Sequence, residues 1–494
     1  MRAELEALIA ETDDKLKSAK NKQIEAAGIN LRERCAKGDE KARTAMVNLI
    51  CEQLEARRGE LEESINSLIT GYTINFFQNV YTGDYSSGRL SGADEEIWRY
   101  FEKFRLPHDS VFEDKLRKLA EIVHAELYGY GIVDFLVFDG GFDEVGINRH
   151  DYIWVQYKGI KRRIPNKVFR FESEEKCRKI IEDRLTSAAD QEMNAGTPII
   201  YAVLLNGSRV TAVRPPLSRY HAVSIRTFKK TDINAEIKDR FIPQKVKDLL
   251  ALLVRKGRRN VAVIGEQGSG KTTLADAIIE MFDPHLSIGL AENVHELDTS
   301  RKYSERNVIE LQYGKEYTPS DIIEMFFRFN RDVVILGEVR NPMEAFEMIK
   351  AMLRQARGSL FTFHTSSVER MIHDLRQLLM QTGFYSDYRE ARFDVADAVD
   401  ICIHIKLDRE TGERYIYRVA EIDASPEDMS YGIKDLFRYD KVRGIYLASR
   451  TGISRGMEKS CLEYEMTHDD VEKLREIFTV AAEEVGRYGY LDAN

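Results

Sequence analysis

The chain has 494 residues, enough for roughly two to four domains that each bury a core of their own. Its 82 acidic residues outnumber its 73 basic residues, and the net charge of −9 argues against a protein whose main task is to coat nucleic acid. The five cysteines are scattered without a C-x-x-C pair, so we expect neither a zinc site nor a disulfide framework, and a reducing cytoplasm fits best.

The first twenty residues, "MRAELEALIAETDDKLKSAK", carry acidic side chains from position 4 and contain no long apolar stretch, so we expect no signal peptide. No stretch of the sequence approaches the roughly 18 consecutive apolar residues that a membrane-spanning helix needs. We therefore expect a cytoplasmic protein with no transmembrane segment of its own. If it works at the cytoplasmic face of a membrane, other chains must hold it there.

Residues 1–115 are predicted to form an N-terminal helical region. In "ARTAMVNLICEQLEARRGELEESINSLI" the apolar residues recur at i, i+3 and i+4, which is typical of amphipathic helices. The stretch "YTGDYSSGRLSGADE", at residues 81–95, is dense in Gly, Ser and Asp and predicts a loop between helices. We interpret this region as a helical packing or docking bundle.

Residues 116–235 are predicted to form a small α+β domain. In "GIVDFLVFDGGFDEVGINRHDYIWVQYKGIKRRI", short apolar and aromatic runs alternate with turn residues, which predicts β-hairpins. A helical stretch is expected near residues 172–188. The segments "IIYAVLLNGSRVTAVRPPL" and "AVSIRTF" predict further strands, with a tight turn at Asn206-Gly207.

Residues 236–425 alternate buried strands with helical patterns. A helix is expected in "INAEIKDRFIPQKVKDLLALLVRKGRRN", and the strands are "VAVIG", "LSIGLAEN", "RDVVILGE", "GSLFTFHT" and "AVDICIHIKL". Strands without polar alternation, separated by helices, predict an α/β fold whose parallel sheet is covered on both faces. Residues 426–494 are interpreted as a small C-terminal appendage that ends in the helix "DDVEKLREIFTVAAEEV".

The segment "GEQGSGKT", at residues 265–272, matches G-x-x-x-x-G-K-[ST] between a predicted strand and a predicted helix. Glycines let successive backbone N–H groups face inward at the positive end of the helix and so cradle phosphate. Lys271 can then reach the β- and γ-phosphates and Thr272 can bind Mg²⁺, so ATP and Mg²⁺ are the expected cofactors. The expected nucleotide-binding residues are Gly265, Gly268, Ser269, Gly270, Lys271, Thr272 and Thr273.

Four polar residues follow the other predicted strands: Glu292, Glu296, Glu338 and His364. Because ligands of open α/β sheets bind at the carboxyl ends of strands, these residues are candidates for the same site. Glu338 can bind Mg²⁺ through water or polarise the attacking water. The plainer alternatives remain a surface charge or helix cap for Glu338, a structural role for His364, and an N-terminal helix acid for Glu296.

The order "GEQGSGKT", "AENVHEL", "VILGEVR", "GSLFTFHTSS" resembles the secretion ATPase superfamily, the motors of type II and type IV secretion and of type IV pili. Within it, the sequence is most similar to the CpaF/TadA-type ATPases of tight-adherence (Flp) pili. Upstream, "LLNGSRVTAVRPPL" and "VSIRTFKK" look like the stretches that supply the family's arginines, and the likeness covers about residues 120–460. It implies a RecA-like P-loop ATPase domain, preceded by a PAS-like domain and the helical region.

The resemblance implies a role for each matching residue. Lys271 and Thr272 form the Walker A pair, and Arg340 belongs to the Walker B signature with a less certain role. The implied catalytic residues are Glu338 (Walker B), Glu292 (Asp box), His364 (histidine box), Arg209 and Arg226. The implied metal ligands are Thr272, Glu338 and Glu296.

Two departures from the family pattern concern the rate of hydrolysis. The Asp box reads Ala291-Glu292-Asn293 instead of beginning Ile-Glu-Asp, so one carboxylate is lost beside the metal. Arg354-Gln355-Ala356 replaces the Thr-Gly-His that commonly precedes the histidine box. ATP binding is therefore expected more firmly than fast turnover. Whether Glu292 or Glu338 is the catalytic base stays open.

The resemblance implies a hexameric, ATP-hydrolysing motor that powers pilus assembly or protein secretion with polytopic inner-membrane platform proteins. The alternative is a conjugative type IV secretion ATPase, and the lack of a cysteine quartet argues against the zinc-bearing type II branch. A RecA-type nucleic-acid motor is a weaker alternative, because the basic runs "RKGRRN" (255–260) and "KGIKRR" (158–163) lack interleaved aromatic residues. We expect no direct nucleic-acid partner. A small-molecule kinase would leave the two upstream regions unexplained.

Overall fold

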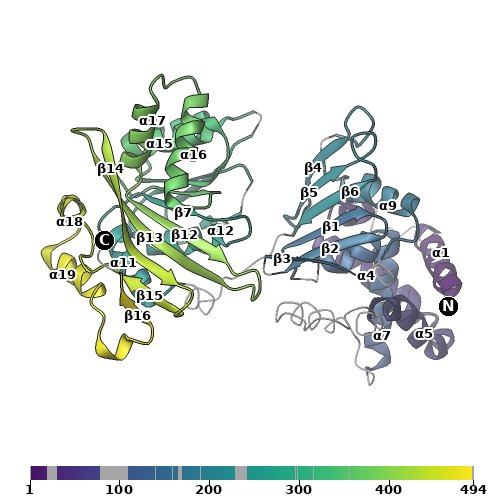
Figure 1. Ribbon diagram of the computed structural model, residues 1–494. Coiled ribbons are helices and arrows are strands. Elements are labelled where there is room, and N and C mark those ends of the chain that lie inside the picture. The colour runs from purple at the N-terminus through teal and green to yellow at the C-terminus, as the bar shows by residue number, and fades with distance from the viewer. Residues whose placement is uncertain are drawn as a thin grey trace. The chain divides into compact units, whose positions relative to one another are not determined.

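The computed structural model describes residues 2–18, 31–77, 110–138, 141–157, 159–164, 170–189, 191–227, 242–294, 296–297, 299–314, 316–354 and 357–491. The chain divides into two compact units, residues 1–230 with 409–412 and residues 231–408 with 413–494, and each unit has its own sheet (Figure 1). The loop predicted at residues 81–95 lies outside the described residues.

The first unit begins with helices that share one apolar core. They are α1 (Arg2–Ser18), α3 (Leu31–Ala36), α4 (Glu40–Glu55), α5 (Arg58–Phe77) and α7 (Phe112–Leu127). Asp39 caps α4 by accepting from the backbone N–H groups of Lys41 and Ala42. Ile50 of α4 and Leu119 of α7 are fully buried in this core, which confirms the amphipathic helices that the apolar spacing predicts.

The helices are followed by an antiparallel six-stranded sheet in the order β3-β2-β1-β6-β5-β4. Its strands are β1 (Glu144–Arg149), β2 (Tyr152–Tyr157), β3 (Ile160–Arg163), β4 (Ile199–Val203), β5 (Arg209–Val213) and β6 (Ala222–Arg226). Its buried face shares a core with the short helices η1 (Gly131–Val133), α8 (Asp134–Phe138), α9 (Glu174–Ile180) and the π-helix η2 (Ile181–Leu185). The predicted turn at Asn206-Gly207 joins β4 to β5, with Gly207 at φ 87°.

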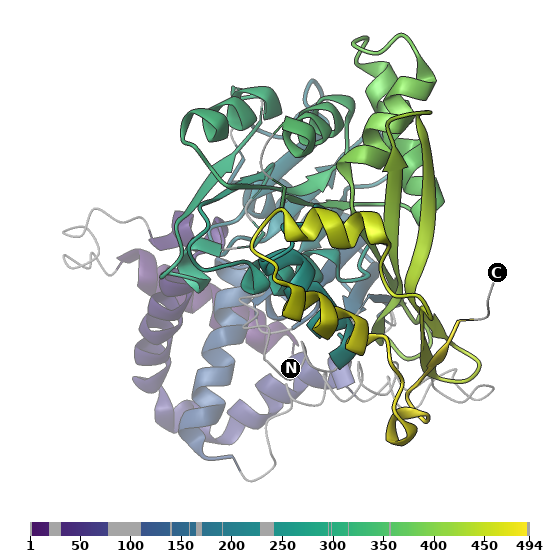
Figure 2. The ribbon, with the colours of Figure 1, turned by 90° about the vertical axis from the view of Figure 1, so that its left-hand side faces the viewer.

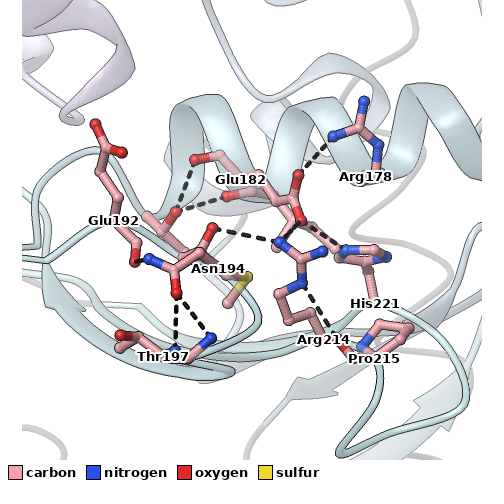
Figure 3. A network of polar contacts seen from close by, with 12 residues as sticks. Arg178, Glu182, Glu192, Asn194, Thr197, Arg214, Pro215 and His221 are labelled. Carbon is pink, nitrogen blue, oxygen red and sulfur yellow. Dashed lines mark hydrogen bonds and ion pairs between the residues drawn. The ribbon is translucent and has the colours of Figure 1, made fainter.

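One carboxylate, Glu182 of η2, holds the loop between β5 and β6 (Figure 3). It accepts from Arg178 Nη1 at 2.6 Å, from His221 Nε2 at 2.8 Å and pairs with Arg214 Nη1 at 3.0 Å. Burial favours its neutral form, but the hydrogen bonds from His221 and Arg178 hold the pKa of Glu182 below its usual range. Glu182 therefore anchors the closed end of the hairpin that carries Arg209 and Arg226.

The second unit contains a ten-stranded sheet in the order β16-β15-β14-β13-β12-β7-β11-β10-β8-β9. Its strands are β7 (Val261–Ile264), β8 (Ile288–Glu292), β9 (Val308–Gln312), β10 (Val333–Val339), β11 (Leu360–Phe363), β12 (Ile401–Leu407), β13 (Arg414–Ser425), β14 (Ser430–Asp440), β15 (Ile445–Ala448) and β16 (Tyr488–Tyr490). The block from β12 to β9 is parallel, as the sequence predicts.

Helices cover both faces of this sheet. One set comprises α11 (Gln244–Arg255), α12 (Lys271–Met281), α18 (Arg455–Leu462) and α19 (His468–Ile477); the other comprises α14 (Pro319–Arg328), α15 (Pro342–Arg354), α16 (Val368–Gln381) and α17 (Tyr388–Ala398) (Figures 1 and 2). Val261 and Val263 of β7 belong to the first core, whereas Ala262 and Ile264 belong to the second. Because every residue of β7 is buried, the strand shows no polar alternation.

The sheet continues past residue 425, where the sequence suggested a separate appendage. Ser425 of β13 pairs with Ser430 of β14, and β15 and β16 extend the same sheet. Helix α7 likewise spans the suggested limit at residue 115. The proposed limits at 115, 235 and 425 stay predictions, while the overall class of an α/β P-loop domain preceded by an α+β domain and helices is confirmed.

Candidate nucleotide site

The loop of residues 265–270 connects the buried strand β7 to the first residue of α12, Lys271. Gly268 and Gly270 have φ angles of 76° and 97°, in the left-handed region that favours glycine. A Cβ atom on Gly265 would lie only 2.4 Å from the backbone oxygen of Ile405 on β12. The glycine spacing is therefore what allows the loop to curl closely against the neighbouring strand.

Two buried polar groups point to an anion at this loop. The Lys271 ammonium is buried and donates to the backbone oxygens of Gly265, at 3.2 Å, and Glu266, at 3.1 Å. The Ser269 hydroxyl is fully buried and has no hydrogen-bond partner among the described residues. A buried hydroxyl without a partner is costly, and a phosphate oxygen would accept its proton. The hydrogen-bond donors of this loop thus fit the phosphates of a nucleoside triphosphate.

A chain of contacts joins the loop helix to strand β8. Thr272 Oγ1 donates to Glu296 Oε2 at 3.1 Å, and the Glu296 backbone N–H lies 3.2 Å from both carboxylate oxygens of Glu292. A Cβ on Gly337 of β10 would lie 3.0 Å from Glu292 Oε1, so this glycine leaves room for the carboxylate. The structure thereby brings together Thr272, Glu296 and Glu292, as the sequence predicts.

Glu338 lies near the carboxyl end of β10, where the pairing with β11 shifts between Leu336 and Val339. Arg340 donates to its carboxylate through Nε, at 2.8 Å, and through Nη2. The backbone N–H groups of Arg340 and Asn341 in turn donate to buried Glu344, whose pKa is raised by burial. The Glu338 carboxylate is therefore oriented by a guanidinium and held at the same sheet edge as the loop.

The exposed residue His364 immediately follows β11, which lies between β7 and β10. Phe363 pairs with Ile264 on one side and Val339 pairs with Phe363 on the other. His364 therefore follows the strand between the loop and Glu338. Among the described residues no group of three or more His, Cys, Asp or Glu is suited to hold a metal by itself. A Mg²⁺ ion would need nucleotide oxygens and water besides Thr272, Glu296 and Glu338.

Arg209 and Arg226 lie in the first unit, directly opposite each other on β5 and β6. Glu144 of β1 is the other cross-strand neighbour of Arg226. Like charges in directly opposed positions repel one another in a sheet, and the neighbouring Glu144 carboxylate offsets part of that repulsion. The structure thus brings the two arginines together; their approach to a nucleotide stays a prediction.

Arg414, the first residue of β13, is a candidate that sequence patterns did not indicate. Its Nε donates to the backbone oxygen of Gly268 at 3.2 Å, and its Cδ lies 2.9 Å from the position of a Cβ on Gly270. No sequence motif indicates this role for Arg414. The residue lies beside the loop only because β12 and β13 come next to β7 in the folded sheet. A cation here holds the outward-facing carbonyl of the loop and so favours inward-facing N–H groups.

Replacing Arg414 by Ala is expected to weaken MgATP binding about tenfold, because a charge-assisted hydrogen bond that shapes the loop is lost. Titration with a fluorescent ATP analogue measures the change, and Arg414→Lys, which keeps the charge, should recover part of it. Unchanged affinity in Arg414→Ala at an unchanged melting temperature would show that the contact with Gly268 does not shape the loop.

The fold and this loop define a P-loop nucleotide-binding protein. The model of the family described as "Type II/IV secretion system protein" matches residues 142–423, more than half of the chain, and the protein belongs to this family. With its phosphate-binding loop it is a member of the secretion ATPase superfamily, which confirms the resemblance noted in the sequence. The closer likeness to the CpaF/TadA type stays a prediction.

Individual relatives are more distant. A putative conjugal transfer protein of Mycobacterium tuberculosis is 26% identical over 313 residues, covering 61% of this chain and 86% of its own. The type IV secretion system protein VirB11 of Brucella suis is 24% identical over 251 residues, 44% of this chain and 68% of its own.

The solved structures with similarity include the VirB11 ATPase of Brucella suis in complex with sulphate, at 22% identity and a TM-score of 0.33, covering 57% of this chain and 89% of that one. They also include the pilus retraction motor PilT with bound ADP, at 13% identity and a TM-score of 0.39, covering 70% of this chain and 96% of that one.

In the part of this chain that the structure describes, no helix is both long and apolar enough to cross a membrane.

Proposed function

We propose that this protein is an ATP-hydrolysing motor that works as a hexameric ring and powers pilus assembly or protein secretion across the cell envelope. The observation that carries the proposal is the phosphate-binding loop, where Lys271 is buried and the buried Ser269 hydroxyl has no hydrogen-bond partner among the described residues. Family membership supports the same class of activity. A motor of this kind would work in the cytoplasm, bound to its partners at the cytoplasmic face of the membrane.

The proposed chemistry assigns each group at the sheet edge one task. Lys271 and the loop N–H groups bind the phosphates, and Thr272, Glu296 and Glu338 would hold Mg²⁺, which would supply positive charge beside the phosphoryl oxygens. Glu338 or Glu292 orients the attacking water and accepts its proton. His364 contacts the γ-phosphate. It therefore detects whether the γ-phosphate is present in the site beside Glu338.

The partners divide the proposal into two branches. In the Tad/Flp branch, polytopic inner-membrane platform proteins of a pilus receive the work of the ring. In the conjugative type IV branch, a relaxosome or coupling protein does so, and the names of the conjugal transfer and VirB11 relatives favour this alternative. A crosslinked pulldown from membranes separates the two branches by the proteins it recovers. Stimulation of hydrolysis by single-stranded DNA would instead support a nucleic-acid motor.

The two arginines allow a test of whether one copy of the chain contributes to the nucleotide site of its neighbour. If Arg209 and Arg226 of one copy complete the charge clamp on the nucleotide of its neighbour, Arg209→Ala and Arg226→Ala should each lower turnover by about 10³-fold. The loss is expected with the fold intact, because both side chains lie on the open face of their sheet. Specific activity of the wild-type protein should rise with its concentration as rings assemble.

Light scattering and ATPase assays over a dilution series, with ATP and Mg²⁺ present, measure both effects. Arg219→Ala is the matched control, because this exposed arginine lies in the loop at the other end of the same hairpin. A fully active monomer, or wild-type rates in both arginine variants, would contradict the ring and the trans arginines.

A further inference from the structure

Tyr313, which directly follows β9, is a buried residue to which no sequence motif assigns a role. It is 4% exposed, and it belongs to the apolar core that α14 and α15 share with the sheet. Its backbone holds the end of β8. The Tyr313 N–H donates to the backbone oxygen of Glu292 at 3.0 Å, and the Tyr313 carbonyl accepts from Asn293 Nδ2 at 3.4 Å. Tyr313 is therefore tied to the segment that carries one of the two candidate catalytic bases.

The Tyr313 hydroxyl leads to the other candidate base through Glu344. It donates to the Glu344 carboxylate, and burial raises the pKa of Tyr313, so the hydroxyl keeps its proton. Glu344 is 3% exposed and also accepts from the backbone N–H of Arg340 at 2.5 Å. Arg340 Nε in turn donates to Glu338 at 2.8 Å. A chain of hydrogen bonds through Tyr313 therefore joins the segment of Glu292 to Glu338.

A helix cap accounts for only part of this arrangement. At the start of α15 the Glu344 N–H donates to Asn341 Oδ1 at 3.0 Å, and the Asn341 N–H donates to Glu344 Oε2 at 3.1 Å. This exchange needs neither the Tyr313 hydroxyl nor the backbone of Arg340. The hydroxyl therefore adds a connection from the end of β9 to the end of β10 that the cap does not supply.

The backbone ladder between β8 and β10 stops short of both acids. Its last register pair is Ala291 with Leu336, one residue before Glu292 and two before Glu338. The acids are nevertheless close, because a Cβ on Gly337 would lie 3.0 Å from Glu292 Oε1. The contacts through Tyr313 and Glu344 thus extend the fixed geometry of the sheet to the two carboxylates.

We propose that Tyr313 is a positioning residue for ATP hydrolysis, which fixes the spacing of Glu292 and Glu338 through Glu344 and Arg340. The inference rests on the proposed function, in which one of the two acids orients the attacking water, and it adds the residue that places that acid. A displacement of about 1 Å at a reacting group can lower a rate by about 10²-fold, so one hydrogen bond in this bridge has a measurable effect.

The same bridge gives the altered Asp box a role. Asn293 stands where the resemblance leads us to expect Asp, and its side-chain amide donates to the Tyr313 carbonyl. The Asn293 backbone oxygen accepts from Gln312 Nε2 at 2.9 Å, so the ends of β8 and β9 are held on both sides. A carboxylate at position 293 cannot donate and would face the carbonyl oxygen of Tyr313. Asn293 therefore belongs to the bridge.

Tyr313→Phe removes only the hydroxyl and keeps the ring in its core. Single-turnover hydrolysis should slow about tenfold, while equilibrium MgATP affinity stays within about twofold, because the bridge does not include the phosphate-binding loop. In combination with whichever of Glu338→Gln and Glu292→Gln loses turnover, Tyr313→Phe should cause no further loss, since the group that it positions is gone. A merely structural role would lower the melting temperature instead, and the two losses would add.

Tyr317→Phe is the matched control, because this 61%-exposed tyrosine lies in the same loop between β9 and α14. Wild-type turnover in Tyr313→Phe, or a loss that adds fully to that of the base variant, would overturn the inference and leave the proposed function standing. Wild-type protein that binds MgATP without hydrolysing it would overturn both.

Asn293→Asp separates the bridge from the simple loss of an acid. The bridge predicts about threefold slower single-turnover hydrolysis, because the donor to Tyr313 is lost and a carboxylate faces its carbonyl. If the missing carboxylate were what limits the protein, the same variant would hydrolyse ATP faster than the wild type. Faster hydrolysis in Asn293→Asp would overturn the part of Asn293 in the bridge.

Discussion

Lys271→Ala is expected to abolish tight MgATP binding, with a loss of affinity of about 10²-fold or more. The ammonium is buried beside the loop that receives the phosphates, and alanine leaves their charge without its cation. The backbone oxygens of Gly265 and Glu266 also lose a donor. Calorimetric titration with ATP and Mg²⁺ measures the effect directly.

Two controls separate lost binding from lost structure. The melting temperature without nucleotide should change far less than the nucleotide affinity, because the strand and helix that hold the loop have their own apolar cores. Lys459→Ala removes an exposed lysine of α18 and should bind like the wild type. Wild-type affinity in Lys271→Ala would mean that phosphate does not bind at this loop.

Glu338→Gln is expected to keep nucleotide affinity and to lower turnover by about 10²-fold or more. The amide has nearly the same shape and can still accept a hydrogen bond from Arg340, but it cannot accept a proton from water as a carboxylate does. Equilibrium binding and single-turnover hydrolysis, measured on the same preparation, separate the two effects.

The companion variants decide which acid carries the role. Glu324→Gln changes an exposed acid of α14 and should hydrolyse ATP at the wild-type rate. If Glu338→Gln keeps its turnover while Glu292→Gln loses it, the catalytic base is Glu292, whose carboxylate faces the backbone N–H of Glu296. Turnover retained in both variants would remove both acids from the base role.

Local patterns were enough to predict the parts of the site that sit next to their own strands. The glycine spacing of residues 265–270 fixes the loop, and unbroken apolar runs such as Val333–Leu336 identify strands buried on both faces. Because parallel strands end at one edge, Glu292, Glu338 and His364 could be assigned to that edge before any coordinates.

Long-range pairing decides the rest, and sequence periodicity does not encode it. Arg414 contacts Gly268 because β13 follows β12 beside the loop strand, and no pattern near Arg414 indicates this. The continuation of the sheet through β14–β16 was missed for the same reason, since a hairpin across residue 425 resembles a separate appendage in the linear sequence. The register that opposes Arg209 and Arg226 is likewise a property of the folded sheet.

The interior position of the site strands limits where movement can arise. β7, β8, β10 and β11 are each hydrogen-bonded to a strand on both sides. A slip of β7 by one residue would turn Val261 and Val263 out of one core and into the other, so the strand cannot slide under load. The sheet therefore serves as a fixed mechanical frame. Any displacement driven by nucleotide must begin in the loops after these strands or turn the whole unit as a rigid body.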